Sequence, residues 1–195
     1  MKKIALLAAV MVAAIPVAGF AQDAAVDAPT TSAPATAPDG TRAFGIEPYF
    51  GVMGGYDSYD RRSKFGSIND GKMEGALIQG VVGVNVPVGP VFAGVEGNVA
   101  KGFGDIDWEY GVKGRLGARA GESGMVYATA GYEWVNGKHG YSDQHDWIYG
   151  LGVEAGPKDI GLGGLTGNSG LRLRFEVDTF DFDSIRPMAG VIAHF

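Results

Sequence analysis

The feature that most constrains this chain is the segment Ile106–Ala120, in which apolar and polar side chains alternate over 15 residues, IDWEYGVKGRLGARA. Successive side chains of a β-strand point to opposite faces, so the pattern predicts a strand with one apolar and one charged face. Ordinary strands have only about five or six residues. A soluble two-sheet protein would turn the charged face to water, whereas a membrane strand, which needs about 9 to 11 residues, would turn the apolar face to lipid. This segment leaves both folds open.

The start of the chain predicts export from the cytoplasm. Lys2 and Lys3 form a basic head, Ile4–Ala18 is an apolar run, and Gly19–Ala21 is a small-residue cleavage site. These are the three parts of a secretory signal peptide, here residues 1–21. The apolar run, about 15 residues, is too short for a membrane-spanning helix. The sequence contains no cysteine, so neither a disulfide nor a lipid-modified cysteine is available.

Two parts follow the signal peptide. Residues 22–43 are rich in Ala, Pro and Thr and have few large apolar side chains, which predicts a disordered tail, and residues 44–195 suit one domain. The whole chain has 16 basic and 22 acidic residues. Removing the signal peptide takes away two lysines, which leaves 14 against 22 and a net charge of −8. Nucleic-acid binding requires a basic patch, so we expect no nucleic-acid partner.

The remaining segments repeat the two-residue period of Ile106–Ala120, with turn residues between them, and none has a helical period. The predicted strands are residues 44–56, 73–86, 91–101, 106–120, 125–135, 145–155, 171–179 and 185–195. Closing them in sequence order leaves no exposed sheet edge, so the predicted fold is all-β, an eight-stranded antiparallel up-and-down barrel. The connection 156–170 is longer than the short turns expected on the periplasmic side, and the alternation pattern does not explain it.

Aromatic residues favour the transmembrane form of this barrel. With the N-terminus in the periplasm, all three tryptophans fall on apolar faces at the outer ends of their strands. Membrane barrels collect aromatic residues in such a belt, whereas a soluble protein has no reason to do so. The predicted belt consists of Tyr56, Trp108, Tyr110, Tyr132, Trp134, Trp147 and Tyr149.

Several short motifs carry a family resemblance. They are Pro48–Val52 (PYFGV), Val82–Asn85 (VGVN), Gly94–Gly97 (GVEG) and a terminal strand that ends in Phe195. With the signal peptide, they make residues 44–195 resemble the small eight-stranded outer-membrane β-barrels of Gram-negative bacteria, the OmpA/OmpX-like, opacity-protein-like porin family. The resemblance implies an outer-membrane location, contact with outer-membrane lipid and lipopolysaccharide, and recognition of Phe195 as a signal by the barrel assembly machinery. We expect a monomer.

Turning the polar faces inward predicts a lumen with nearly balanced charges. An eight-stranded barrel is only wide enough for side chains to fill, so these charges should form an ion-pair network that plugs the interior. The network is predicted to contain Glu96, Glu109, Lys113, Arg115, Arg119, Glu133, Glu154, Arg172, Arg174 and Glu176, and the same faces carry Glu47, Asp107, Asp178, Arg186 and His194.

The sequence predicts no catalytic residue, no metal site and no cofactor. Lipid A deacylases of similar barrels use a closely spaced His and Ser, which the three histidines lack, and the loop acids Asp57, Asp60 and Asp70 lack the spacing of metal ligands. We therefore expect a non-enzymatic barrel with a structural or surface-interaction role. Its outer loop 57–72, with Tyr59 and Phe65, is the candidate for contact with lipopolysaccharide. A narrow pore for small solutes is the alternative, and a secreted soluble ligand-binding barrel is disfavoured because its lumen would be apolar.

Overall fold

The computed structural model describes residues 45–60, 64–65, 72–120, 124–156 and 170–195. The predicted signal peptide, the predicted tail and most of the connection 156–170 lie outside these residues. The described part of the chain has no helix that is long and apolar enough to cross a membrane. Its strands are β1 (Glu47–Tyr59), β2 (Glu74–Val88), β3 (Val91–Gly104), β4 (Ile106–Ala120), β5 (Gly124–Gly137), β6 (Gln144–Ala155), β7 (Leu171–Phe180) and β8 (Ser184–His194).

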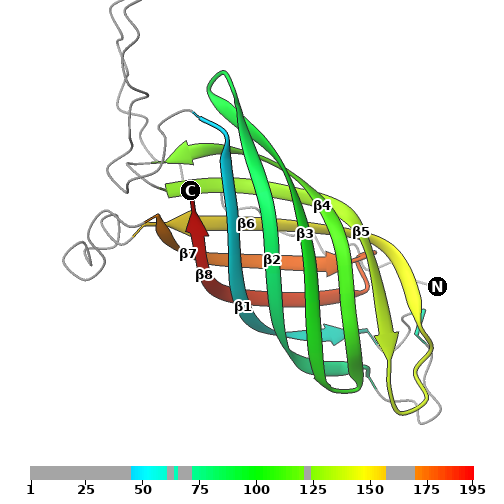
Figure 1. Ribbon diagram of the computed structural model, residues 1–195. Helices are drawn as coiled ribbons and strands as arrows, with labels where there is room; N and C mark the ends of the chain where they lie inside the picture. Colours follow the sequence, from blue (N-terminus) through cyan, green and yellow to red (C-terminus); the bar gives the residue numbers. More distant parts are fainter. Residues whose placement is uncertain (1–44, 61–63, 66–71, 121–123, 157–169) are drawn as a thin grey trace, which may run out of the picture. The chain divides into compact units, whose positions relative to one another are not determined.

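The eight strands form a closed antiparallel barrel, as predicted (Figure 1). Each strand pairs with the next in sequence, and β8 returns to pair with β1, from Tyr49 opposite His194 to Tyr59 opposite Ser184. Closure gives every strand two hydrogen-bonded neighbours, so the sheet has no unpaired edge. The ends of the barrel differ: the start of β1 and Phe195 lie at one end, called here the inner end. The turns β1–β2, β3–β4, β5–β6 and β7–β8 lie at the other, the outer end.

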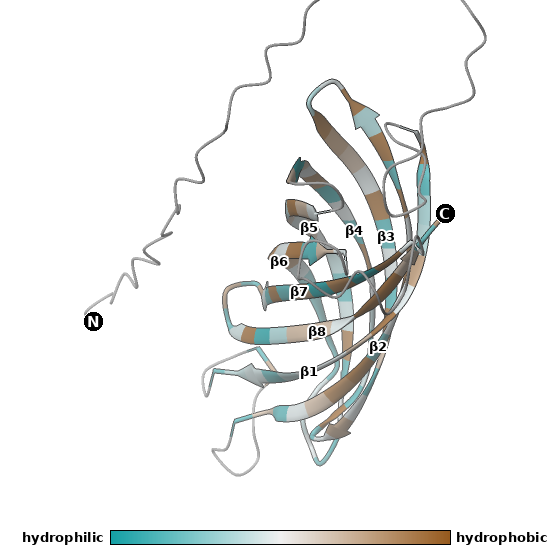
Figure 2. Ribbon diagram, turned by 90° about the vertical axis from the view of Figure 1, so that its left-hand side faces the viewer, coloured by the Kyte–Doolittle hydropathy of each residue, from teal (hydrophilic) through white to brown (hydrophobic). Residues whose placement is uncertain are grey.

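Burial alternates along the strands with a period of two. In β1, Glu47, Tyr49 and Met53 are buried inside the barrel, whereas Phe50 and the other residues of opposite parity face outward. The outward side chains are mainly apolar and remain exposed, for example Phe50 at 57% and Leu116 at 61%. Figure 2 shows the result as hydrophobic and hydrophilic residues in turn along the strands. The charged face of each strand therefore points inward.

The predicted alternation of β4 fails at its first two residues. Ile106 is fully buried inside the barrel, and Asp107 is partly exposed beside Lys101 and Lys138. The pairing of β4 with β5 shifts register between Ile106 and Trp108, which is a β-bulge, and an extra residue at a bulge reverses the faces of the residues before it. Asp107 was predicted in the lumen, and that prediction is wrong.

Several strands continue further at the outer end than predicted, β1 and β3 by three residues each. β1 runs to Tyr59, so Asp57 and Tyr59 are buried strand residues instead of loop residues. β3 runs to Gly104, which adopts a φ of 103°, a conformation that only glycine adopts readily. A single residue, Asp105, then separates β3 from β4.

Candidate functional site: an ion network inside the barrel

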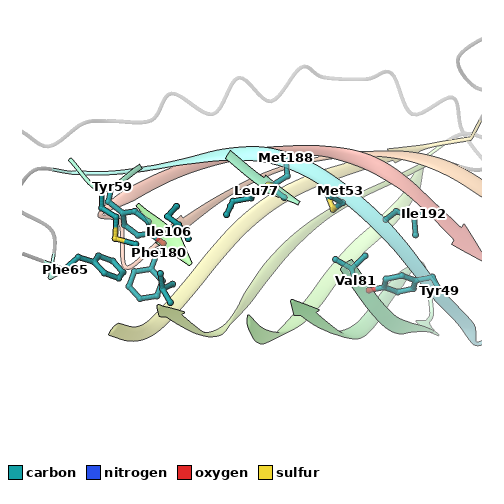
Figure 3. Close-up of a cluster of buried hydrophobic side chains, with 12 residues drawn as sticks. Tyr49, Met53, Tyr59, Phe65, Leu77, Val81, Ile106, Phe180, Met188 and Ile192 are labelled. Carbon is teal, nitrogen blue, oxygen red and sulfur yellow. The ribbon is translucent and has the colours of Figure 1, made fainter. Parts of the chain in front are cut away.

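A buried apolar cluster runs along the wall of the lumen formed by β1, β2 and β8. Side chains from these strands form one buried cluster with residues at the outer end (Figure 3). The sequence-based description of the lumen as a charged interior missed this wall, although Leu77 and Val81 interrupt the polar face of β2. The cluster consists of Tyr49, Met53, Tyr59, Phe65, Met73, Leu77, Val81, Ile106, Val135, Phe180, Met188 and Ile192.

Three aromatic rings cap the lumen at its outer end. Phe65 lies 4.5 Å from Tyr59 and 5.6 Å from Phe180, measured between ring centroids. Ser142 holds Phe65 in place, because its amide N and its Oγ both donate to the Phe65 carbonyl, at 3.1 and 2.9 Å. Tyr59 and Phe65 were predicted to contact lipopolysaccharide from a loop. Both are buried, so that assignment is wrong for these two side chains.

Lys64 supports this aromatic cap, defined as Tyr59, Phe65 and Phe180. Its ammonium group forms ion pairs with the carboxylates of Asp146 on β6 and Asp181 in the β7–β8 turn. The two hydrogen-bonded carboxylates raise the pKa of Lys64 above its usual range. Lys64, which precedes Phe65 of the cap, is therefore linked to β6 and to the β7–β8 turn.

An inner group of charged side chains surrounds Arg174. The carboxylate of Glu154 accepts from Nη2 of Arg115 at 2.6 Å and from Nε of Arg174 at 2.9 Å, and it lies 2.7 Å from Nε2 of His194. Arg174 also donates to Glu96 through Nη1. Glu154 pairs directly with Arg174 on the neighbouring strand, whereas Glu96 lies on β3, so one contact of Arg174 follows the wall and the other crosses the lumen.

Tyrosine rings complete the coordination of the inner group. The guanidinium carbon of Arg115 lies 3.9 Å from the ring centroid of Tyr127 and 4.9 Å from that of Tyr49, distances typical of cation–π contacts. The hydroxyl of Tyr49 donates to Glu96 at 2.9 Å, and that of Tyr127 donates to Glu176 at 2.7 Å. Each phenol therefore satisfies one carboxylate oxygen while its ring lies against a cation.

An outer group is built around Arg186. Its Nη1 lies 2.5 Å from Glu109, and its Nη2 lies 3.1 Å from both Glu133 and Asp178. Tyr59 of the aromatic cap donates to Glu109 at 3.2 Å, which joins the cap to the network.

Lys113 connects the two groups. Its ammonium group binds Glu176 and lies 3.3 Å from Asp178 and 3.7 Å from Glu96. Asp178 belongs to the outer group and Glu96 to the inner group. One ammonium group therefore makes the network continuous along the lumen.

The structure brings the predicted network residues together. Nine of the ten are buried, and Arg119 is 24% exposed at the inner rim, where it lies 2.7 Å from Glu47. Glu47 also lies 3.6 Å from Arg172. Asp57 is a buried acid that was predicted to lie in a loop. It lies four residues after Met53 and therefore on the same inward face of β1. Among the described residues, no cluster of three His, Asp or Glu side chains is arranged to hold a metal ion.

Phe195 closes the seam between the first and last strands at the inner end. Its ring stacks on Phe50 with centroids 5.5 Å apart, and its amide N donates to the Pro48 carbonyl at 3.0 Å. The ring is 60% exposed on the outward face. The terminal residue therefore belongs to the apolar exterior and contacts the opening motif of the barrel.

The exterior decides where the barrel resides. At the outer end, five rings of the predicted belt and Phe182 of the β7–β8 turn form a continuous series with centroids 5.1 to 6.4 Å apart. The other two predicted members, Tyr56 and Trp108, are exposed on the same outward surface. Below the rings the outward side chains are apolar, and the charges are inside. A closed barrel pairs its backbone N–H and C=O groups between its own strands, and this exterior presents an apolar band to lipid. The protein is a transmembrane β-barrel. The series of rings is Tyr110, Trp134, Tyr132, Trp147, Tyr149 and Phe182.

Comparison with known proteins gives only distant similarities to this barrel. No family model matches the chain, and no curated protein matches it. Among solved structures, the attachment invasion locus protein Ail of Yersinia pestis is 14% identical, with 78% of this chain and 98% of that chain covered and a TM-score of 0.47. A de novo designed transmembrane β-barrel is 12% identical, with 77% and 96% covered and a TM-score of 0.45.

A third solved structure is larger than this chain. OmpT, an outer membrane protein of Vibrio cholerae, is 14% identical, with 76% of this chain and 55% of that chain covered and a TM-score of 0.31. None of these similarities assigns a function to the barrel.

Proposed function

We propose that this protein is a monomeric, non-enzymatic structural barrel whose lumen is plugged by its own ion network. The observation that carries the proposal is that each buried cation of the network pairs with at least one carboxylate on a strand that is not its neighbour. Lys113 on β4 binds Glu176 on β7, and Arg186 on β8 binds Glu133 on β5. Such contacts cross the lumen, so they occupy the path that a solute would follow.

The aromatic cap supports the same proposal at the outer end. Tyr59, Phe65 and Phe180 are each buried, and the cap lies over the outer group of the network. A solute would therefore have to displace an apolar cluster and then separate several buried ion pairs. Removing one partner of a buried pair costs about 3 to 5 kcal/mol, so the open state should be rarely populated.

The surroundings of the histidines support a role without catalysis. His145 Nδ1 lies 2.6 Å from the Tyr132 hydroxyl, His194 contacts Glu154, and His139 Nδ1 lies 3.2 Å from Asp105. Among the described residues, the side-chain partner of each histidine is therefore a phenol or a carboxylate and not a serine nucleophile.

Conductance measurements test the proposal. The purified protein in a planar lipid bilayer should give no stable channels, because the ion pairs and the cap block the lumen. The triple variant Lys113→Ala, Arg174→Ala, Phe65→Ala removes two cations with their side-chain volume and one ring of the cap, so it should give channels if it still folds. Its folding is checked by the different migration of unboiled and boiled samples in electrophoresis. Steady wild-type channels, even of small conductance, would contradict the proposal and favour the narrow pore for small solutes.

A further inference from the structure

The lipid-facing surface has a hollow that the plugged-barrel proposal does not use. The hollow has a volume of about 360 Å³ and lies across β3, β4 and β5. The outward residues that line it are Ala93, Gly114, Leu116, Ala128 and Ala130.

Larger outward side chains border the hollow on both sides. In one row of paired residues, Gly114 and Ala130 lie between Val95 on β3 and Tyr149 on β6. In the next row, Ala128 pairs with Leu151, which is 60% exposed. The small residues therefore form a recess between larger outward side chains.

The depth of the hollow identifies what covers it. Tyr132 belongs to the aromatic belt, which marks the membrane interface, and Ala130 and Ala128 follow on the same face of β5. At about 3.4 Å per residue and a tilt of about 45°, Ala128 lies about 10 Å below Tyr132. One leaflet of a hydrocarbon core of about 30 Å is about 15 Å thick. The hollow is therefore continuous with the lipid interface and lies at the level of the acyl chains of one leaflet.

The glycine at the centre of the hollow is not required by the packing of the barrel. A Cβ atom added to Gly114 would lie 3.6 Å from the Ala130 carbonyl oxygen, an ordinary contact. By contrast, a Cβ atom added to the inward Gly131 would lie 2.6 Å from Cα of Lys113, and something would have to move. The space at Gly114 opens toward the membrane, and a larger side chain there would fill the hollow.

We propose that this hollow retains one acyl chain of a membrane lipid. A chain over the small residues can lie closer to the backbone of β4 and β5 than a chain lying over the larger side chains beside it, and the added dispersion contacts favour this position. The polar end of the same lipid lies at the level of the Tyr132–His145 pair, whose hydrogen bond joins the hydroxyl to Nδ1. This leaves Nε2 of the exposed imidazole to face the lipid ester and phosphate oxygens.

Native mass spectrometry tests the proposal. The protein is refolded in vesicles of dimyristoylphosphatidylcholine, extracted into a mild detergent and weighed intact. The wild type should retain one lipid, and Gly114→Leu should lower the retained fraction on the order of tenfold. Gly80→Leu is the matched control, because Gly80 also faces outward and a Cβ there would lie 4.0 Å from its nearest neighbour, Val99. It should retain the lipid.

Folding of each variant is checked by electrophoresis of unboiled samples, and Ala128→Leu replaces Gly114→Leu if that variant does not fold. Wild-type protein that carries no lipid would overturn the proposal, as would equal retention by Gly114→Leu. A lipid-free dimer that Gly114→Leu dissociates would also overturn it, because a second copy of the chain would then cover the hollow.

Discussion

Replacing Arg174 by methionine should lower the free energy of unfolding by about 3 to 5 kcal/mol, because it leaves buried carboxylates without a cation. The guanidinium group reaches Glu154 through Nε at 2.9 Å and Nη2 at 2.8 Å, and it also binds Glu96. Methionine has a similar length and fills most of the same volume. The change therefore removes the charge and the hydrogen bonds while creating little cavity.

The contacts that Glu154 and Glu96 keep determine where the loss falls between about 3 and 5 kcal/mol. After the substitution, Glu154 keeps Arg115 at 2.6 Å and His194 at 2.7 Å, and Glu96 keeps the Tyr49 hydroxyl at 2.9 Å. These contacts still satisfy part of each carboxylate, so we expect a loss near 3 kcal/mol, the lower limit for a broken buried pair.

Urea-induced unfolding in lipid vesicles measures this loss, with Lys101→Ala as the control. Lys101 pairs with Asp107 at the rim, where both side chains are more than one-third exposed, so its removal should leave the free energy of unfolding nearly unchanged. A loss below about 0.5 kcal/mol for Arg174→Met, the value typical of exposed pairs, would refute the reasoning, because it would mean that water solvates the network.

Two further predictions concern the ends of the barrel. Deleting Phe195 should strongly reduce assembly in cells while refolding in detergent changes little, because the residue is proposed to be a signal for the barrel assembly machinery. Equal losses in both settings would leave only its stacking on Phe50. At the outer end, the raised pKa of Lys64 keeps the side chain charged below the ordinary lysine pKa of about 10.4, and its contribution is lost only as the pH rises through the raised value. Amide exchange at Ser142, corrected for intrinsic rates, should therefore be equally protected from about pH 6 to about pH 9. Lys64→Gln should reduce this protection, and unchanged protection would contradict a supporting role for Lys64.

The sequence predicts the architecture because strand alternation is a local property. In β1, the parity of Phe50 and Met53 is enough to tell outside from inside, and the same rule applies to every strand. The rule fails at Ile106 because the bulge depends on how β4 pairs with β5, and pairing involves residues distant in sequence. Asp57 was missed for a simpler reason, since the predicted strand ended too early at the polar stretch that follows Tyr56.

The membership of the ion network could be predicted, but its pairs could not. Parity alone places Glu96, Lys113 and Arg174 inside the barrel. Which cation meets which carboxylate depends on the stagger of the strands around the closed barrel, which no single segment reveals. Leu77 and Val81 illustrate the same limit, because their apolar character on an inward face becomes intelligible only beside Met188 and Ile192 of the strand that closes the barrel.

Solvent access to the lumen tests the central claim most directly. The sequence has no cysteine, so a single cysteine can report on one position. Thr129 is buried on the inward face of β5 and is close in size to cysteine, whereas Asp143 is exposed at the outer end. In native protein in vesicles, a membrane-impermeant maleimide should label Asp143→Cys rapidly and leave Thr129→Cys unlabelled until urea unfolds the barrel. Labelling of Thr129→Cys in the folded barrel as fast as Asp143→Cys would mean an open, water-filled lumen and would contradict the plugged barrel.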